Sequence, residues 1–266
     1  MRDVTVLTQI LIPDAKSLPV CTLVLDSFRV GFPTAKIICS FVKNKFSDKN
    51  PRVMHKLEQK CHAQNIKLVK PHSKYPWNFY RQNYYRYATK QVVFIDGDVI
   101  FWESCEKFTF APSTLLAGFK VPRMWNEYTQ CVSVERIHPS FMWLPDTNAL
   151  HEIIKRDFRN ETLPLSDVWS PFHVYSKNDK TIFHDTASNL YAMVESEHFT
   201  EPHLNCYDHL HCSTDVKAFT QRCATPEAFL ATHNLAVTNP SALRGLWREH
   251  VHYYARHTVP NPCDNH

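Results

Sequence analysis

The sequence predicts an α/β protein with a mostly parallel central sheet that is flanked by helices. Short apolar runs rich in Val and Ile alternate with helix-like segments over the first 95 residues. That alternation is typical of a parallel sheet built from β-α-β units. A length of 266 residues with 44% apolar residues is enough for one large core. We therefore expect a single domain spanning residues 1–266.

Four strands and three helices are expected before residue 102. Ser17 is a candidate N-cap for the first helix, and Gly31 is placed to end that helix. Pro51 fits the first turn of the second helix. In order, the expected elements are strand 4–8, helix 18–30, strand 35–42, helix 51–64, strand 66–69, helix 78–89 and strand 92–95.

The pattern is looser after residue 102. Asp146 is a candidate N-cap for a helix that ends near Phe158. The remaining expectations are strands 115–121 and 140–144, an irregular segment 160–178, a helix 186–195, a loop 198–215 dense in His, Asp and Cys, and helices 226–233 and 240–256.

Composition excludes several classes of protein. The net charge is +4, and no run of five or more Lys and Arg residues occurs, so a nucleic-acid partner is not expected. Only four glycines are present, and they form neither a GxGxxG nor a GxxxxGK[ST] motif. Dinucleotide-fingerprint and P-loop sites are therefore not predicted.

Nine scattered cysteines, with no CxxC pair, indicate reduced thiols and a cytoplasmic location. No N-terminal signal peptide is evident. No apolar segment reaches 18 residues, so no transmembrane helix is expected.

The most informative stretch is VVFIDGDVIFW, residues 92–102. Asp96 and Asp98 follow a buried-type strand and are separated by Gly97, which lets the backbone turn or approach a ligand closely. Charged side chains are rarely fully buried unless they are paired or bound to a metal. Two carboxylates form a hard oxygen site that suits Mn²⁺ or Mg²⁺ carrying a diphosphate. A β-hairpin turn is the alternative, because Asp-Gly is a strong turn signal.

The arrangement resembles the GT-A class of nucleotide-sugar-dependent glycosyltransferases. Asp96-Gly97-Asp98 matches the DxD motif of that class, and the β-α order up to residue 102 matches as well. The resemblance implies transfer of a sugar from a nucleotide sugar to a glycan, lipid-linked or protein acceptor, and a UDP-linked donor is favoured over a GDP-linked one. It implies a nucleotide-sugar-binding half, 1–102, and an acceptor-binding half, 103–266. It also implies that Thr8, at the end of the first strand, helps to cradle the nucleotide.

The resemblance further implies a third metal ligand toward the carboxyl end of the chain, commonly a histidine. His211 is preferred over His209 within NCYDHLHC. A zinc site made of Cys206, His209, His211 and Cys212 is the alternative, although its spacing is more compact than in the usual zinc motifs.

Other site residues are less specific. Arg81 and Arg86 lie on the expected helix before the aspartates, and Arg86 is preferred as a diphosphate contact because arginine forks match phosphate oxygens. Asp185, which resembles an acceptor-side carboxylate of the class, and Asp167 are the candidate catalytic carboxylates. Asp185 is equally consistent with a plain helix N-cap.

Two other functions remain open. A sugar-phosphate nucleotidyltransferase would share the fold and the metal, but the segment after the first strand lacks the glycine-rich loop usual in that family. A non-catalytic carbohydrate-binding protein could keep the fold, although the intact aspartate pair argues against this. The sequence does not decide between inversion and retention at the sugar.

Overall fold

A computed structural model shows how the chain folds. It describes residues 3–12, 15, 18–70, 76–101, 104–121, 124–126, 131–133, 135–158, 172–175, 181–184, 188–194, 199–200 and 207–209. The predictions for helices 226–233 and 240–256 lie outside the described residues.

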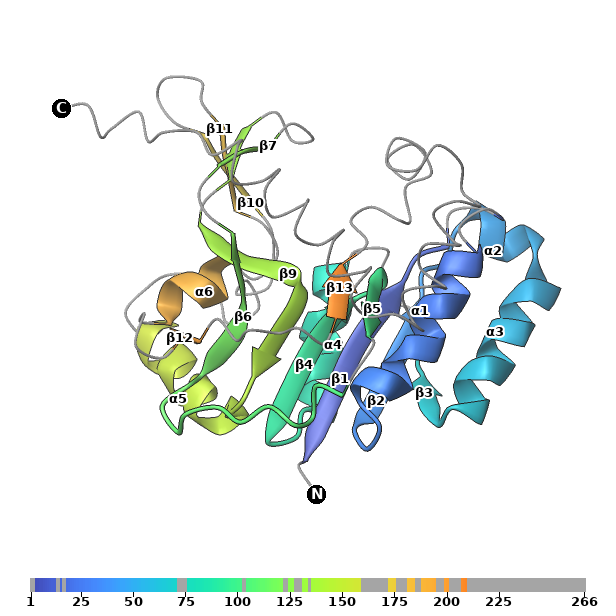
Figure 1. The fold of residues 1–266 in the computed structure, drawn as a ribbon. Helices are drawn as coiled ribbons and strands as arrows, with labels where there is room; N and C mark the ends of the chain where they lie inside the picture. Colours follow the sequence, from blue (N-terminus) through green and yellow to red (C-terminus); the bar gives the residue numbers. More distant parts are fainter. Residues whose placement is uncertain are drawn as a thin grey trace.

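A seven-stranded sheet forms the centre of the protein, in the order β12-β6-β9-β4-β1-β2-β3 (Figure 1). β1 is parallel to both β2 and β4, and β2 is parallel to β3. β9 runs antiparallel to β4 and β6. The predicted fold class, an α/β protein with a mostly parallel central sheet, is therefore confirmed. The strands are β1 (Val4–Ile10), β2 (Lys36–Phe41), β3 (Ile66–Leu68), β4 (Gln91–Asp96), β6 (Leu116–Val121), β9 (Arg136–Leu144) and β12 (Phe199–Thr200).

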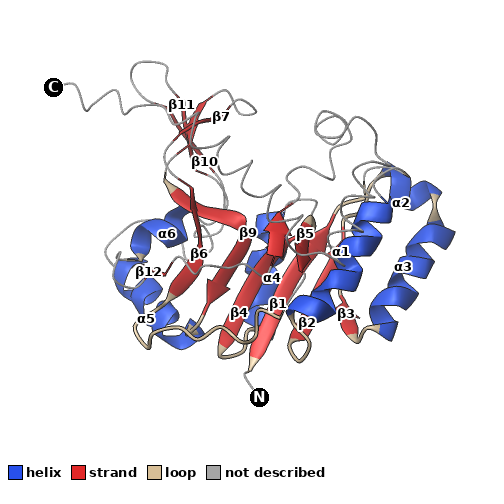
Figure 2. Cartoon of the chain, viewed as in Figure 1, coloured by secondary structure: helices blue, strands red, loops and turns tan. Residues whose placement is uncertain are grey.

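Helices cover both faces of this sheet (Figure 2). They are α1 (Leu18–Gly31), α2 (Lys45–Lys49), α3 (Pro51–Ala63), α4 (Pro76–Tyr87), α5 (Thr147–Phe158) and α6 (Ser188–Met193). Buried side chains of α1 and α3 belong to one core cluster, and those of α4, α5 and α6 belong to another. The sheet thus separates two apolar layers, because alternate side chains of a strand point to opposite faces.

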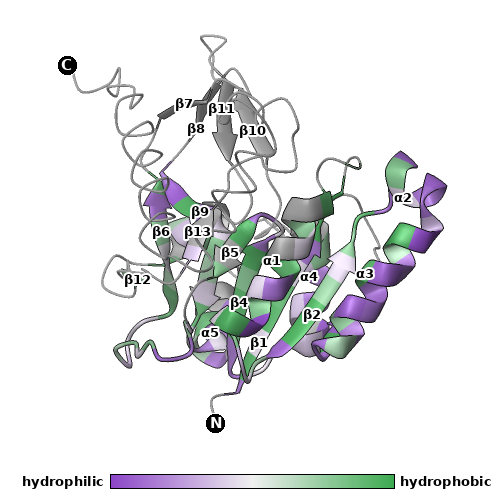
Figure 3. Cartoon of the chain, turned by 45° about the vertical axis from the view of Figure 1, so that its right-hand side comes forward, coloured by the Kyte–Doolittle hydropathy of each residue, from purple (hydrophilic) through white to green (hydrophobic). Residues whose placement is uncertain are grey.

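The hydrophobic strands lie between helices whose outer faces are polar (Figure 3). Val93 and Ile95 of β4 join the cluster with α1, whereas Val92 and Phe94 join the cluster with α4. All four side chains are fully buried. Burial on both faces explains why this strand is a continuous apolar run rather than an alternating one.

Local capping signals set several helix ends. Asp146 accepts hydrogen bonds from the backbone N–H groups of Asn148 and Ala149, at 3.0 and 3.1 Å, so the predicted cap of α5 is confirmed. The sequence prediction missed α2, which starts at a capping box formed by Asn44 and Ser47. Pro51 starts α3, as predicted.

Two further sheets were not predicted. β10 (Phe172–Tyr175), β11 (Thr181–His184), β8 (Cys131–Ser133) and β7 (Met124–Asn126) form a four-stranded sheet, which stands above β6 and β9 in Figure 1. β10 lies in the segment expected to be irregular. β5 (Val99–Phe101) and β13 (Tyr207–His209) form a two-stranded antiparallel sheet. β12 and β13 both lie in the segment expected to be a loop.

The main sheet contains strands from before and after residue 102, since β6, β9 and β12 join β1 to β4. The division into a nucleotide-sugar half and an acceptor half stays a prediction.

The cysteines correct one expectation. Cys21, Cys39 and Cys61 are buried free thiols, but Cys105 is disulfide-bonded. The expectation of reduced thiols is therefore wrong for Cys105, and the cytoplasmic location stays a prediction. No helix in the described parts of the chain combines the length and apolarity needed to cross a bilayer.

Candidate functional site

Asp96 is the last residue of β4 and lies at the carboxyl edge of the parallel strands. In the register of the sheet it is the neighbour of Gln9 on β1, and Gln9 is in turn the neighbour of Ser40 on β2. Gln9 and Ser40 are buried. Ligands of open α/β sheets bind outside this edge. Asp96, the first of the two aspartates, thus lies at the edge of the sheet where ligands bind in proteins of this fold class.

Gly97 is required by close packing against the neighbouring strand. A Cβ atom at this position would lie 2.7 Å from the carbonyl oxygen of Gln9 and 2.9 Å from the Cα of Ile10. Gly97 does not have a positive φ. Because it has no side chain, Gly97 allows the backbone of the turn after β4 to pack closely against the end of β1.

The hairpin alternative is wrong. Gly97 and Asp98 form a turn, but β4 pairs with β1 and β9, whereas β5 pairs with β13. The turn therefore takes the chain out of the main sheet. Asp98 is 8% exposed and directly precedes β5.

Tyr80 of α4 holds the Asp96 carboxylate. Its hydroxyl donates to Asp96 Oδ1 and to the carbonyl oxygen of Ile95, each at 3.1 Å. Burial raises the pKa of Tyr80 well above its usual value, and the nearby charges of Asp96 and Asp98 and the hydrogen bond to Asp96 raise it further. The phenol is therefore a hydrogen-bond donor at neutral pH.

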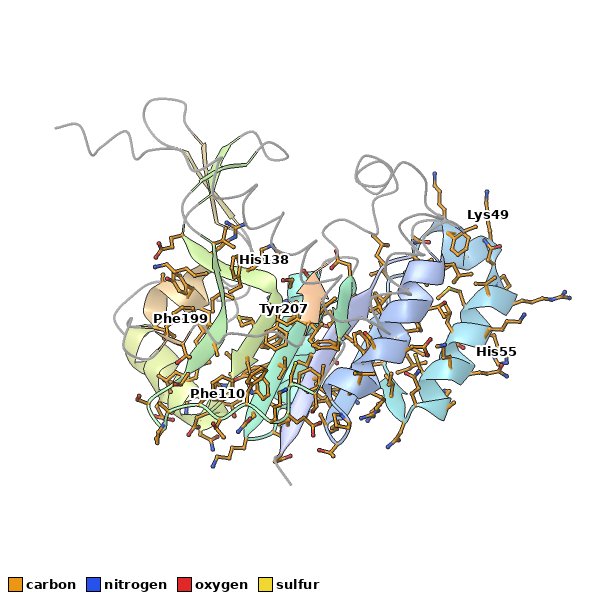
Figure 4. The ribbon with its side chains drawn as sticks, in the orientation of Figure 1. Lys49, His55, Phe110, His138, Phe199 and Tyr207 are labelled. Atoms are coloured by element: carbon orange, nitrogen blue, oxygen red, sulfur yellow. The ribbon has the colours of Figure 1, made fainter. Side chains whose placement is uncertain are left out.

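β13 brings the histidine-rich segment next to the aspartates. In the antiparallel ladder His209 is the partner of Val99, the residue that follows Asp98, and Tyr207 is the partner of Phe101. The Tyr207 ring stacks on Phe141 of β9, with centroids 4.6 Å apart and planes 16° apart, so β13 is fixed over the main sheet (Figure 4). Segments more than 100 residues apart in sequence thus lie side by side.

The donor set fits a hard divalent cation in part. Two carboxylates lie within one turn, and Mg²⁺ sites commonly combine one or two carboxylates with phosphate oxygens and water. Among the described residues, no group of three His, Cys, Asp or Glu side chains is placed to hold a metal. Further ligands would have to come from the nucleotide, from water or from residues beyond the described ones.

The expected position of Thr8 is wrong. β1 continues two residues further, to Ile10, and the Thr8 side chain is fully buried between its strand neighbours Cys39 and Ile95. Gln9, not Thr8, is the neighbour of Asp96. A contact between Thr8 and the nucleotide stays a prediction, and the burial of Thr8 inside the sheet does not favour it.

Arg86 is not brought together with the aspartates. Its guanidinium lies 5.3 Å from the centre of the Tyr87 ring, which the ammonium group of Lys36 approaches to 5.2 Å. Lys36 is the register partner of Thr5 on β1. Thr5 lies four residues before Gln9, the register partner of Asp96. At about 3.3 Å per residue, this separation along the strands is roughly 13 Å. Near its start, α4 contacts the carboxyl end of β4 through Tyr80 and Ile95, whereas at its end the Tyr87 carbonyl oxygen accepts from Thr5, so the last turn with Arg86 lies near the opposite edge of the sheet.

Three predicted site residues, Asp167, Asp185 and His211, lie outside the described residues. Their roles stay predictions. His184, the last residue of β11, directly precedes Asp185.

The sequence prediction missed two residues beside Asp96. Neither Tyr80 nor Gln9 is among the site residues that the sequence predicts. A polar side chain in the second-last position of an apolar strand was the available signal for Gln9, because the ends of parallel strands share an edge. No local signal pairs Tyr80 with Asp96, which lies 16 residues later.

Comparison with known proteins shows only remote likeness. No protein-family model and no curated protein matches the chain. Among solved structures, the bifunctional glycosyltransferase WbbM is 12% identical, with a TM-score of 0.46 over 76% of this chain and 39% of its own. A mannosyltransferase from Pyrobaculum calidifontis, solved with GDP-Man and Mn²⁺, is 11% identical, with a TM-score of 0.39 over 62% and 48%. A cytidylyltransferase from Leptospira borgpetersenii is 9% identical, with a TM-score of 0.45 over 91% and 97%.

This chain therefore covers less than half the length of the first two proteins. At these identities and TM-scores, the likeness assigns neither a family nor an activity to the chain.

Proposed function

We propose that the chain is a metal-dependent glycosyltransferase that uses a nucleotide sugar, with a UDP-linked donor favoured over a GDP-linked one. The observation that carries this proposal is the pair Asp96 and Asp98 in a tight turn at the carboxyl edge of the parallel strands. The DxD resemblance supplies the donor class. The alternation of strands and helices before this turn supports the same function.

The two aspartates have different surroundings, which suggests different roles. Asp96 is held by Tyr80 through one carboxylate oxygen. Asp98 is almost fully buried at the start of the segment that leaves the sheet. We assign Asp98 as the principal metal ligand and Asp96 as a ligand of the metal or of the ribose. A divalent cation bound here would stabilise the negative charge that develops on the departing diphosphate.

His211 is the proposed third protein ligand, with His209 as the alternative. The pairing of β13 with β5 supports this assignment, because it brings the backbone of residues 207–209 beside the strand that follows Asp98. The nearby cysteines keep a zinc site as the alternative for this segment. Histidine and carboxylate ligands together suit Mn²⁺, and carboxylates with phosphate oxygens suit Mg²⁺.

The acceptor side of the proposal rests on the second half of the chain. Residues 103–266 would bind a glycan, lipid-linked or protein acceptor. In an inverting transfer, Asp185 or Asp167 would take the proton of the acceptor hydroxyl, because such a transfer needs a carboxylate near the acceptor as the general base.

A donor panel tests the proposal. Purified protein is incubated with UDP- and GDP-linked sugars, with Mn²⁺, with Mg²⁺ or with EDTA, and the released nucleoside diphosphate is measured. We expect metal-dependent release of UDP from at least one UDP-sugar, even without acceptor, because water can replace the acceptor slowly. Asp98→Ala should abolish this release.

Asp146→Asn is a matched control. Asp146 is also a carboxylate that follows a strand of the main sheet, but it caps α5, and asparagine caps helices equally well. The control should keep full activity. Unchanged release by Asp98→Ala would rule out the metal assignment. Release of pyrophosphate from a nucleoside triphosphate and a sugar phosphate would instead indicate a nucleotidyltransferase.

A further inference from the structure

Tyr80 lies beneath the proposed metal site in a fixed orientation. Its side chain is 1% exposed. The ring meets Phe94 of β4 edge to face, with centroids 5.0 Å apart and planes 72° apart, and meets Phe79 at 5.8 Å and 64°. These are favoured aromatic geometries. The two contacts fix the direction in which the hydroxyl points.

The Tyr80 hydroxyl is directed at the end of β4. It donates to the carbonyl oxygen of Ile95 and to Asp96 Oδ1, which belong to the last two residues of that strand. A tyrosine carries one donor hydrogen, which these two oxygens share. Packing alone does not explain the hydroxyl, since phenylalanine would fill the same space without burying a polar group.

The backbone of Asp96 is fixed on the other side by β1. Asp96 is level with Gln9 in the parallel ladder, and Gly97 presses directly against the Gln9 carbonyl oxygen. With its backbone held by β1 and its Oδ1 held by Tyr80, the carboxylate of Asp96 has a defined orientation before any ligand binds. Such preorganisation lowers the cost of binding, because less side-chain freedom is lost.

We propose that Tyr80 is the positioning residue of the sugar-nucleotide site: it holds Oδ1 of Asp96 and so directs Oδ2 toward the metal or the ribose of the donor. This inference rests on the proposed function. Residues that orient metal ligands typically change metal affinity by about 10- to 100-fold when they are replaced.

The test compares Tyr80→Phe with Tyr84→Phe. Tyr84 is also fully buried, lies one turn further along α4 and packs on the same Phe94 ring, at 6.1 Å. Both variants lose one buried hydroxyl, but only Tyr80 contacts Asp96. The affinity for Mn²⁺ in the presence of UDP is measured by electron paramagnetic resonance, and Tm is measured in parallel without ligand.

We expect Tyr80→Phe to weaken Mn²⁺–UDP binding about 10-fold or more, and Tyr84→Phe to leave it unchanged. In the background of Asp96→Asn, the further change Tyr80→Phe should have little additional effect, because Tyr80 acts through Asp96. A merely structural role of Tyr80 would lower the Tm of Tyr80→Phe and leave its affinity for Mn²⁺ unchanged. Wild-type affinity in a folded Tyr80→Phe would overturn the positioning role and leave the proposed function intact.

Failure of the function itself gives a different result. If the wild type does not bind Mn²⁺ with UDP, or if Asp98→Asn binds as well as the wild type, the proposed function is wrong, and the role of Tyr80 in it falls as well. A crystal structure of the wild-type complex provides a test that does not depend on a variant folding. It should show Tyr80 on Oδ1 and the ligand on the Oδ2 side, and the reverse arrangement would overturn the inference.

Discussion

Replacing Gly97 by alanine should destabilise the protein before any ligand is considered. The added Cβ would lie 2.7 Å from the Gln9 carbonyl oxygen and 2.9 Å from the Ile10 Cα, and both of these atoms belong to the backbone of β1. β1 is hydrogen-bonded to β2 on one side and β4 on the other. A central strand held on both sides cannot move away without disturbing its ladders.

The size of the effect follows from this geometry. The closest contact is about 0.7 Å shorter than an ordinary van der Waals contact of 3.4 Å. Overpacking of a close-packed interior costs about 1–3 kcal/mol, and a strand fixed on both sides places Gly97→Ala at the upper end, about 3 kcal/mol. For a chain of this size, that corresponds to a fall in Tm of roughly 6–12 °C.

Differential scanning calorimetry without ligand measures this change, and titration with UDP and Mn²⁺ follows it. A Tm within 2 °C of the wild type would refute the packing argument. If Gly97→Ala kept its Tm but failed to bind UDP, the lack of a side chain at this position would be needed for close contact with the ligand rather than for close packing against β1.

Three further predictions concern stability. Arg29→Ala should lower the free energy of unfolding by roughly 2–3 kcal/mol in urea titration, because the guanidinium donates to four backbone carbonyl oxygens at 2.6–3.1 Å. Lysine cannot replace the planar guanidinium fork, so full stability in Arg29→Lys would contradict this explanation. Asn65 has a φ of 54°, a left-handed conformation that alanine adopts poorly and glycine adopts freely. Asn65→Ala should therefore lower the free energy of unfolding by about 1 kcal/mol, whereas Asn65→Gly should leave it nearly unchanged. Equal losses of stability in the two variants would contradict this explanation. Burial lowers the pKa of His151. The unfolded chain therefore takes up this proton at higher pH than the folded chain does, and stability falls as pH drops below about 6.5. The urea midpoint should thus fall less between pH 7.5 and 5.5 in His151→Gln than in the wild type. An equal fall in both would show that His151 does not cause this loss of stability.

The first half of the fold could be predicted because its signals are local. The four apolar runs, together with Gly31 and Pro51, predicted β1 to β4, α1, α3 and α4 to within a few residues, whereas the predicted cap Ser17 lies outside the described residues. The end of β1 was placed too early, because Thr8 and Gln9 look like a polar strand end. Both are buried in the sheet. Burial from neighbouring strands cannot be seen along the chain.

The second half depends on pairing between distant segments. β13 consists of Tyr-Asp-His, which has no strand-like apolar pattern, and it is a strand because it pairs with β5. The position of Asp96 could be predicted from the end of an apolar run. The hydrogen bond from Tyr80 could not, because it requires α4 to pack across β4 in one register. The distance of Arg86 from the aspartates could not be predicted for a related reason: the direction of α4 over the sheet decides which of its ends is near the carboxyl edge.

The most direct test of the central claim is the binding of UDP to the wild type, Asp98→Asn and Asp146→Asn, measured by isothermal titration calorimetry with Mn²⁺ and with EDTA. We expect Mn²⁺ to strengthen binding to the wild type and to Asp146→Asn by 10-fold or more, and to have no effect on Asp98→Asn. UDP binding that is the same with Mn²⁺ and with EDTA, or an Mn²⁺ effect that persists in Asp98→Asn, would contradict a metal-dependent sugar-nucleotide site at this turn.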